Sequence, residues 1–139
     1  LIRSARIVND SKPGWVIDNV QASIGKHLME HPHKTSADVR LALYGLTFKP
    51  DIDDLRESPA LAIAESLVKT HPGSIQIAEP NIDTLPEGLK TADLVQTEAV
   101  LADVHVMLVD HSTFIKLPKP NGIVVDTRGV WHQGFGTSN

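Results

Sequence analysis

The chain has 139 residues, of which 41% are hydrophobic, so it can fold around a core of its own. Its net charge of −4 excludes the basic face that nonspecific nucleic-acid binding requires, and the absence of cysteine excludes disulfides, thiolate metal sites and a cysteine nucleophile within the chain. No apolar run approaches the roughly 18 residues that suggest a membrane span, so we expect neither nucleic acid nor a membrane as a partner.

The first part of the chain is predicted to be mostly helical. Residues 1–9 have the pattern of a helix whose beginning is missing, and the chain starts without Met, so we expect a piece of a longer protein. In the break that follows, Asp10 or Ser11 is expected to cap a second helix and Pro13 to occupy its first turn. That helix, over 14–30, carries apolar residues at steps of three and four, which predict one buried stripe: Ile17, Val20, Ile24 and Leu28.

From residue 39 onward, short β-like runs alternate with helical patterns. Ser58 and Pro59 mark the start of the clearest helix, over 58–70, and weaker helical patterns follow over 97–103 and 111–117. Strands are expected at 39–45, 74–80, 93–95, 104–110 and 122–126. This alternation predicts an α/β fold, a three-layer Rossmann-like structure with a mostly parallel sheet and right-handed crossovers.

Charged residues are densest in the loop over 46–57, between the first strand and its helix. The carboxyl ends of parallel strands meet at one edge of a sheet, which is where ligands bind. This edge is expected to collect Lys49 and Arg56 from the loop and Arg128 from the end of the last strand. A lysine and two arginines favour an anionic ligand such as a phosphate or carboxylate. Mutual pairing of surface charges accounts for the same residues equally well.

Other residues near this edge have two interpretations from the sequence alone. Phe48 either packs on a sugar or base of a ligand or anchors the loop in the core. His111 follows a predicted strand and is either a site residue or a helix cap. Farther away, His31 and His33 flank a proline and fit an exposed linker better than a metal site.

Several well-known site patterns fit poorly or are missing. Asp53 and Asp54 after the first strand are compatible with a magnesium site of the receiver-domain kind, but such a domain ends its last strand in lysine, whereas this one ends in Asp126-Thr127-Arg128. No G-x-S-x-G elbow, Walker loop or G-x-G-x-x-G fingerprint is present. We therefore do not expect this chain alone to cradle a dinucleotide in the usual way.

Three stretches resemble a known family. "YGLTFKPDIDDLRESPALAIAESL" at 44–67 and "VVDTRGVW" at 124–131 resemble the carboxyl-terminal UDP-binding domain of the UDP-glucose/GDP-mannose dehydrogenase family. "ARIVNDSKPGWVI" at 5–17 resembles the family's central helical region, which joins its two Rossmann-like domains and forms much of the dimer contact. The resemblance implies three parts, with bounds 1–35 for the end of the central dimerisation region, 36–131 for a UDP-sugar-binding domain and 132–139 for a tail.

The resemblance also implies a function. Enzymes of this family oxidise the C6 alcohol of a UDP-sugar to a carboxylate through two hydride transfers to NAD, and their NAD fingerprint and catalytic cysteine lie in an amino-terminal portion that is absent here. It therefore implies a cytoplasmic, homodimeric enzyme whose C-terminal piece is inactive alone and holds no catalytic residue and no metal. By motif, Phe48, Lys49 and Arg128 resemble substrate contacts, and Arg56 resembles a contact to NAD.

Two other functions stay open at this point. One is a free-standing Rossmann-like module that binds a ligand or regulates another protein. The other is a phosphoryl hydrolase that uses Asp53 and Asp54, which metal dependence would reveal.

Overall fold

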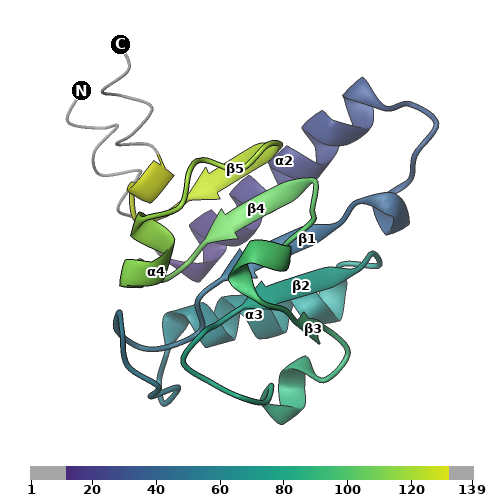
Figure 1. Ribbon diagram of the computed structural model, residues 1–139. Coiled ribbons are helices and arrows are strands. Elements are labelled where there is room, and N and C mark those ends of the chain that lie inside the picture. The colour runs from purple at the N-terminus through teal and green to yellow at the C-terminus, as the bar shows by residue number, and fades with distance from the viewer. Residues whose placement is uncertain (1–11, 132–139) are drawn as a thin grey trace.

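A five-stranded sheet organises the computed structural model, which describes residues 12–131 (Figure 1). The strand order is β3-β2-β1-β4-β5, and every neighbouring pair is parallel. The strands are β1 Leu41–Tyr44, β2 Ile75–Ala78, β3 Asp93–Leu94, β4 Val104–Met107 and β5 Ile123–Asp126. Each lies within the run predicted for it and is shorter, because the flanking residues bend into loops. The α/β fold is confirmed, and the described sheet is parallel throughout.

Before and between these strands, residues 12–131 form α-helices and short 3₁₀ helices. They are α2 Pro13–Glu30, α3 Pro59–Thr70, α4 Ser112–Ile115, η1 Ser36–Asp38, η2 Glu87–Leu89 and η3 Thr97–Ala99. The prediction of a helix over 97–103 is wrong for residues 100–103, because the helical backbone ends with η3. Val100 already has extended backbone, and the N–H of Leu101 donates to Oε1 of Gln76 at 2.8 Å, so the chain turns toward β4 instead.

Helix α2 differs from prediction at its start and in its buried face. Its N-cap is Lys12, without a side-chain capping bond, so the cap predicted at Asp10 or Ser11 is wrong; those two residues lie outside the described ones, as do the predicted helix at 1–9 and the tail at 132–139. Pro13 begins the helix as expected. The buried residues are Val16, Val20, Ile24 and His27, while Ile17 and Leu28 pack at the margin of the same core.

Helix α3 begins as its sequence predicts. The Ser58 hydroxyl accepts a hydrogen bond from the N–H of Leu61 at 3.2 Å, and Pro59 occupies the first helical position. The same hydroxyl donates to the carbonyl of Leu46 at 2.7 Å. Ser58 therefore joins the start of α3 to the start of the loop that leaves β1.

The sheet separates two hydrophobic clusters of unequal thickness. Leu41 and Leu43 of β1 belong to the cluster that contains the buried faces of α2 and α3. Tyr44, one residue on, belongs to the opposite cluster, where it packs on Phe114 of α4 and on Trp131. The three predicted layers are present, and within residues 12–131 the layer on the Tyr44 side of the sheet is built on the short helix α4 and its neighbouring segments. None of the helices within residues 12–131 combines the length and apolarity needed to cross a membrane.

Gly45 sets the path of the chain as it leaves β1. Its φ is +96°, a conformation that side chains rarely adopt, and a Cβ there would lie 2.5 Å from the Cβ of Val109. Glycine thus lets the end of β1 pass directly beside the connection between β4 and α4. The loop that follows starts next to residues about 65 positions farther along the chain.

Candidate functional site

The candidate site is the edge of the sheet where the parallel strands end. Each of the five strands is followed by a segment that leaves this edge: the β1–α3 loop at 45–58, the turn after β2 at 79–81, the segment after β3 at 95–96, the β4–α4 connection at 108–111 and the turn after β5 at 127–129. Because the strand order changes direction between β1 and β4, the β1–α3 loop lies at the switch point where such sheets bind ligands. The predicted site residues all belong to these connections.

Phe48 and Lys49 lie together on the β1–α3 loop. Phe48 is 46% exposed, and Nζ of Lys49 lies 5.9 Å from the centre of its ring. The alternative in which Phe48 anchors the loop in the core is therefore wrong. The loop is ordered by its own bonds: the N–H of Phe48 donates to the carbonyl of Asp54 at 2.8 Å, and the Thr47 hydroxyl donates to the carbonyl of Lys49 at 2.7 Å.

Arg56 forms a two-bonded pair with Asp54. Nε and Nη2 of Arg56 donate to the two carboxylate oxygens of Asp54, each at 3.0 Å, and the Arg56 side chain is 87% exposed. The hydrogen bonds from Arg56 lower the pKa of Asp54 to about 2. This part of the loop does show mutual charge pairing, as the alternative interpretation predicted, yet the exposed guanidinium can still turn toward a ligand.

Arg128 is held on the backbone of the β4–α4 connection. Its Nε donates to the carbonyl of Leu108 at 3.3 Å, and its side chain is half-buried. The turn that carries it is shaped by Asp126, whose carboxylate accepts the backbone N–H groups of residues 128–131 at 2.7–3.2 Å. Lys49 and Arg56 thus reach the edge from the β1–α3 loop, and Arg128 reaches it from the turn after β5.

Glu79 and His111 form a buried pair behind this edge that sequence reasoning did not assign. Glu79 is 2% exposed and His111 is fully buried, with Nε2 of His111 2.9 Å from Oε1 of Glu79. His111 is the N-cap residue of α4, but its side chain makes no capping bond, so the helix-cap role is wrong for the ring. A carboxylate and an imidazole at the ends of the two strands flanking β1 were the signal that could have found them.

The carboxylate of Glu79 stays ionised despite its burial. Burial acts to raise the pKa of Glu79, but hydrogen bonds from His111 and from the N–H groups of Leu46 and Asn81 outweigh it, and the pKa lies below its ordinary value. These two backbone bonds measure 2.7 and 3.0 Å. A buried carboxylate with this many donors is a fixed part of the structure.

Residues 12–131 contain no cluster of three or more His, Asp or Glu side chains that could hold a metal ion. Both oxygens of Asp54 are engaged by Arg56, which disfavours a magnesium site on the Asp53–Asp54 pair. His31 stacks on His27 of α2 with ring centres 4.2 Å apart, and the ring of His33 lies edge-on to His31 at 6.3 Å.

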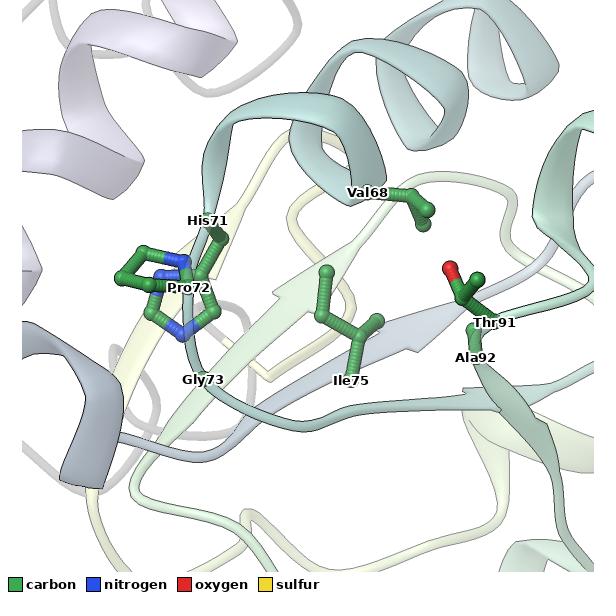
Figure 2. A pocket seen from close by; sticks show the side chains of 7 residues that line it. All are labelled: Val68, His71, Pro72, Gly73, Ile75, Thr91 and Ala92. Carbon is green, nitrogen blue, oxygen red and sulfur yellow. The ribbon is translucent and has the colours of Figure 1, made fainter.

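Two hollows lie at opposite ends of β2. One, of about 360 Å³, opens at the carboxyl ends of β2 and β3 beside Glu79, between Ile82 and Gln96. The other, of about 200 Å³, lies at the amino end of β2, where Figure 2 shows Ile75 between His71 on one side and Thr91 on the other. Only the first adjoins the candidate site.

A parallel sheet with its switch point beneath a densely charged loop defines a Rossmann-like ligand-binding domain. Residues 42–133 match the UDP-glucose/GDP-mannose dehydrogenase family, UDP binding domain, and this chain belongs to that family. The resemblance of residues 44–67 and 124–131 to the UDP-binding domain is thereby confirmed.

Curated relatives point in the same direction. The chain is 47% identical over 137 residues to UDP-N-acetyl-D-mannosamine dehydrogenases of Salmonella typhi and of Escherichia coli (strain K12). It is 41% identical over 136 residues to the NDP-N-acetyl-D-galactosaminuronic acid dehydrogenase of Ralstonia nicotianae. The alignments cover 94% of this chain but only 30–32% of the relatives, so the chain spans about a third of their length.

Solved structures share the fold. The UDP-N-acetyl-mannosamine dehydrogenase Cap5O from S. aureus superposes with a TM-score of 0.60 at 26% identity, covering 85% of this chain and 27% of that one. A UDP-glucose dehydrogenase from Pyrobaculum islandicum gives 0.58 at 19% identity, covering 81% and 27%. The second likeness concerns the fold alone.

Proposed function

We propose that this chain is the nucleotide-sugar-binding C-terminal part of an NAD-dependent UDP-N-acetyl-D-mannosamine 6-dehydrogenase, which oxidises the C6 alcohol of its substrate to a uronate. The observation that carries this proposal is the 47% identity to UDP-N-acetyl-D-mannosamine dehydrogenases across 94% of the chain. The 41% identity to a galactosaminuronic acid enzyme over the same coverage is lower and favours the mannosamine substrate.

The residues of the edge have the chemistry for such a substrate. Lys49 and Arg128 are cations at the two sides of the switch point and suit the diphosphate, one as a point charge and the other as a planar donor. The exposed ring of Phe48 offers an apolar face to the sugar or the base. Binding energy gathered here, remote from C6, would hold the reacting carbon in place.

The chain does not fit NAD by itself. The turn after β1 lacks the glycine fingerprint, and Ser58 and Pro59 occupy the start of α3, where a Rossmann domain would receive the pyrophosphate. With no cysteine either, the chain lacks the family's nucleophile. We propose that NAD binds mainly to the rest of the enzyme and that Arg56 reaches NAD across the cleft between the two parts.

We also propose that residues 36–131 form the UDP-sugar-binding domain and that residues 1–35 contribute to a homodimer contact. The intact enzyme would be cytoplasmic and take part in polysaccharide biosynthesis.

NADH formation by the intact enzyme across a panel of UDP-sugars tests this function. We expect turnover with UDP-N-acetylhexosamines and a preference for UDP-N-acetyl-D-mannosamine. Preference for UDP-glucose would overturn the assigned sugar, and no turnover with any of them would overturn the enzyme. In that case the free-standing binding module would be favoured, and a gene without an upstream G-x-G-x-x-G and cysteine would agree with it.

A further inference from the structure

We propose that Glu79 and His111 form a buried clamp that holds the β1–α3 loop in the shape that presents Phe48 and Lys49, and that both are positioning residues for the substrate. This inference rests on the proposed function for the identity of the ligand that the loop binds. The way in which the loop is held does not depend on that function.

The clamp straddles the strand from which the loop departs. Glu79 follows β2 and His111 follows β4, and these are the two neighbours of β1 in the sheet. Their side chains meet behind the loop at 2.9 Å. The clamp therefore joins three segments of the chain that only the folded sheet brings together.

The hydrogen bonds assign the proton on the imidazole. The backbone N–H of Asp51 lies 2.8 Å from Nδ1 of His111 and can only donate, so Nδ1 offers its lone pair. Nε2 then carries the proton and donates it to Oε1 of Glu79. His111 is thus a neutral imidazole that links a loop amide to a buried carboxylate.

The loop is fixed at two points, and the ligand-binding residues lie between them. Oε1 of Glu79 accepts the N–H of Leu46 at 2.7 Å, and His111 accepts the N–H of Asp51. Phe48 and Lys49 fall within this short span. Their placement relative to the sheet is therefore set by the clamp, while their own side chains stay exposed.

The backbone of the loop shows why a clamp is needed. Asp51 has a φ of +62°, a left-handed conformation that is unfavourable for a residue other than glycine and persists only when its surroundings hold it. The backbone N–H of Asp51 donates to His111, and its carboxylate accepts hydrogen bonds from the N–H and the hydroxyl of Ser112 at 2.9 and 3.0 Å. Loss of these bonds would let the loop relax and carry Lys49 away.

Glu79 follows the second strand, a position at which an acidic residue has a different function in dinucleotide-binding Rossmann domains. The acidic residue after the second strand of a dinucleotide-binding unit bonds the ribose of the cofactor. Here that acid is buried, and both of its oxygens are engaged inside the protein. Glu79 therefore holds the β1–α3 loop through hydrogen bonds within the protein.

Two substitutions separate the halves of the clamp in the intact enzyme. In His111→Gln the amide reaches about as far as Nε2 and can still donate to Glu79, but the N–H of Asp51 loses its acceptor. In His111→Asn the amide reaches only as far as Nδ1, so Asp51 keeps an acceptor and Glu79 loses a donor. We expect the KM for the UDP-sugar to rise roughly 2- to 12-fold in His111→Gln, and less in His111→Asn.

Stability should change in the opposite order. His111→Asn removes a bond to a buried carboxylate and should lower the melting temperature more than His111→Gln does. A purely structural role for His111 would make KM follow the melting temperature, so a larger rise of KM in the less stable variant would overturn the clamp. His71→Asn is the matched control, because His71 is also buried but bonds the Val39 carbonyl at 2.7 Å at the opposite edge of the sheet; it should lose stability without a change in KM.

Amide hydrogen exchange at Asp51 tests the clamp without any substrate. We expect exchange to quicken in His111→Gln and to stay slow in His111→Asn, and equal exchange in both would overturn the proposal. If UDP-sugars are not turned over at all, the proposed function fails while this measurement still decides the clamp. If neither His111 variant folds, Asp51→Asn replaces them. Asparagine tolerates the left-handed backbone and keeps an Oδ1 acceptor for Ser112, so we expect this variant to fold and to keep slow exchange at its own N–H. Fast exchange at that N–H would contradict the clamp.

Discussion

Arg56 and Asp54 face each other two residues apart, joined by a pair of 3.0 Å hydrogen bonds that turn the guanidinium back along its own loop. An arginine that is to reach a cofactor across a cleft must therefore exchange this partner or carry it along. The pair is solvent-exposed and close in sequence, so the exchange meets little resistance.

The first prediction concerns Arg56. In the intact enzyme, Arg56→Ala should lower kcat/KM for NAD by roughly 10- to 150-fold, as expected for a lost bond to a charged group, and should leave the affinity for the UDP-sugar nearly unchanged. Steady-state kinetics with each substrate varied in turn measure both. Asp54→Ala is the control, since it frees Arg56 without removing it, and a loss as large as that of Arg56→Ala would show that the pair, and not the arginine, matters.

The second prediction assigns Lys49 to the substrate. Lys49→Ala should weaken UDP-sugar binding by roughly 10- to 150-fold, because a diphosphate loses one cationic donor. Titration calorimetry with UDP-sugar measures this directly. Lys69→Ala, an exposed lysine in the last turn of α3, should have no effect on binding. Equal losses of UDP-sugar affinity in Lys49→Ala and Arg56→Ala would contradict the division of roles between them.

The third prediction concerns the joint at Ser58. Its hydroxyl both caps α3 and donates to the Leu46 carbonyl, so Ser58→Ala removes a cap and leaves a buried acceptor unpaired. We expect the free energy of unfolding to fall by about 1–3 kcal/mol. Urea denaturation measures it, and Ser58→Thr, which keeps the hydroxyl, should restore part of the loss. An unchanged free energy of unfolding in Ser58→Ala would show that this cap contributes little to stability.

Local chemistry explains which elements could be predicted from the sequence. Ser58 and Pro59 carry their structural signal within a few residues, and the start of α3 follows from it. Regular alternation of strands and helices likewise sufficed for the parallel sheet. The cap of α2 was missed because Asp10 and Ser11 have the right chemistry but the helix starts after Lys12.

Long-range relationships could not be predicted from these patterns. Glu79 and His111 lie 32 positions apart, and each bonds to the β1–α3 loop only after the sheet has formed. The gathering of Lys49, Arg56 and Arg128 at one edge was predicted because parallel topology alone requires it. Their individual partners, such as Asp54 for Arg56, depend on side-chain geometry that spacing does not specify.

The fourth prediction uses Tyr44, the single tyrosine of the chain. Its hydroxyl donates to Nδ1 of His105 at 2.8 Å, and Nε2 of His105 donates to the Asn121 carbonyl at 2.9 Å, so the imidazole is neutral. Burial lowers the pKa of His105, which agrees with this assignment, and burial raises the pKa of Tyr44 to about 12 from an ordinary value of 10.0.

The sign of the effect on stability follows from these values. Below pH 10 the phenol is neutral in the folded and unfolded chain, and its contribution is intact. Between pH 10 and about 12 the unfolded tyrosine loses its proton while the folded one keeps it, so the free energy of unfolding should fall by about 1.4 kcal/mol per pH unit. Tyr44→Phe should lack this component while sharing every other pH-dependent contribution to stability. Denaturation of both proteins from pH 9 to 12 measures the difference, and phenolate absorbance reports ionisation of the lone tyrosine directly. Ionisation of Tyr44 near pH 10 in the folded chain would show that the Tyr44–His105 pair is open to solvent. Parallel curves of unfolding free energy against pH for the two proteins would show the same.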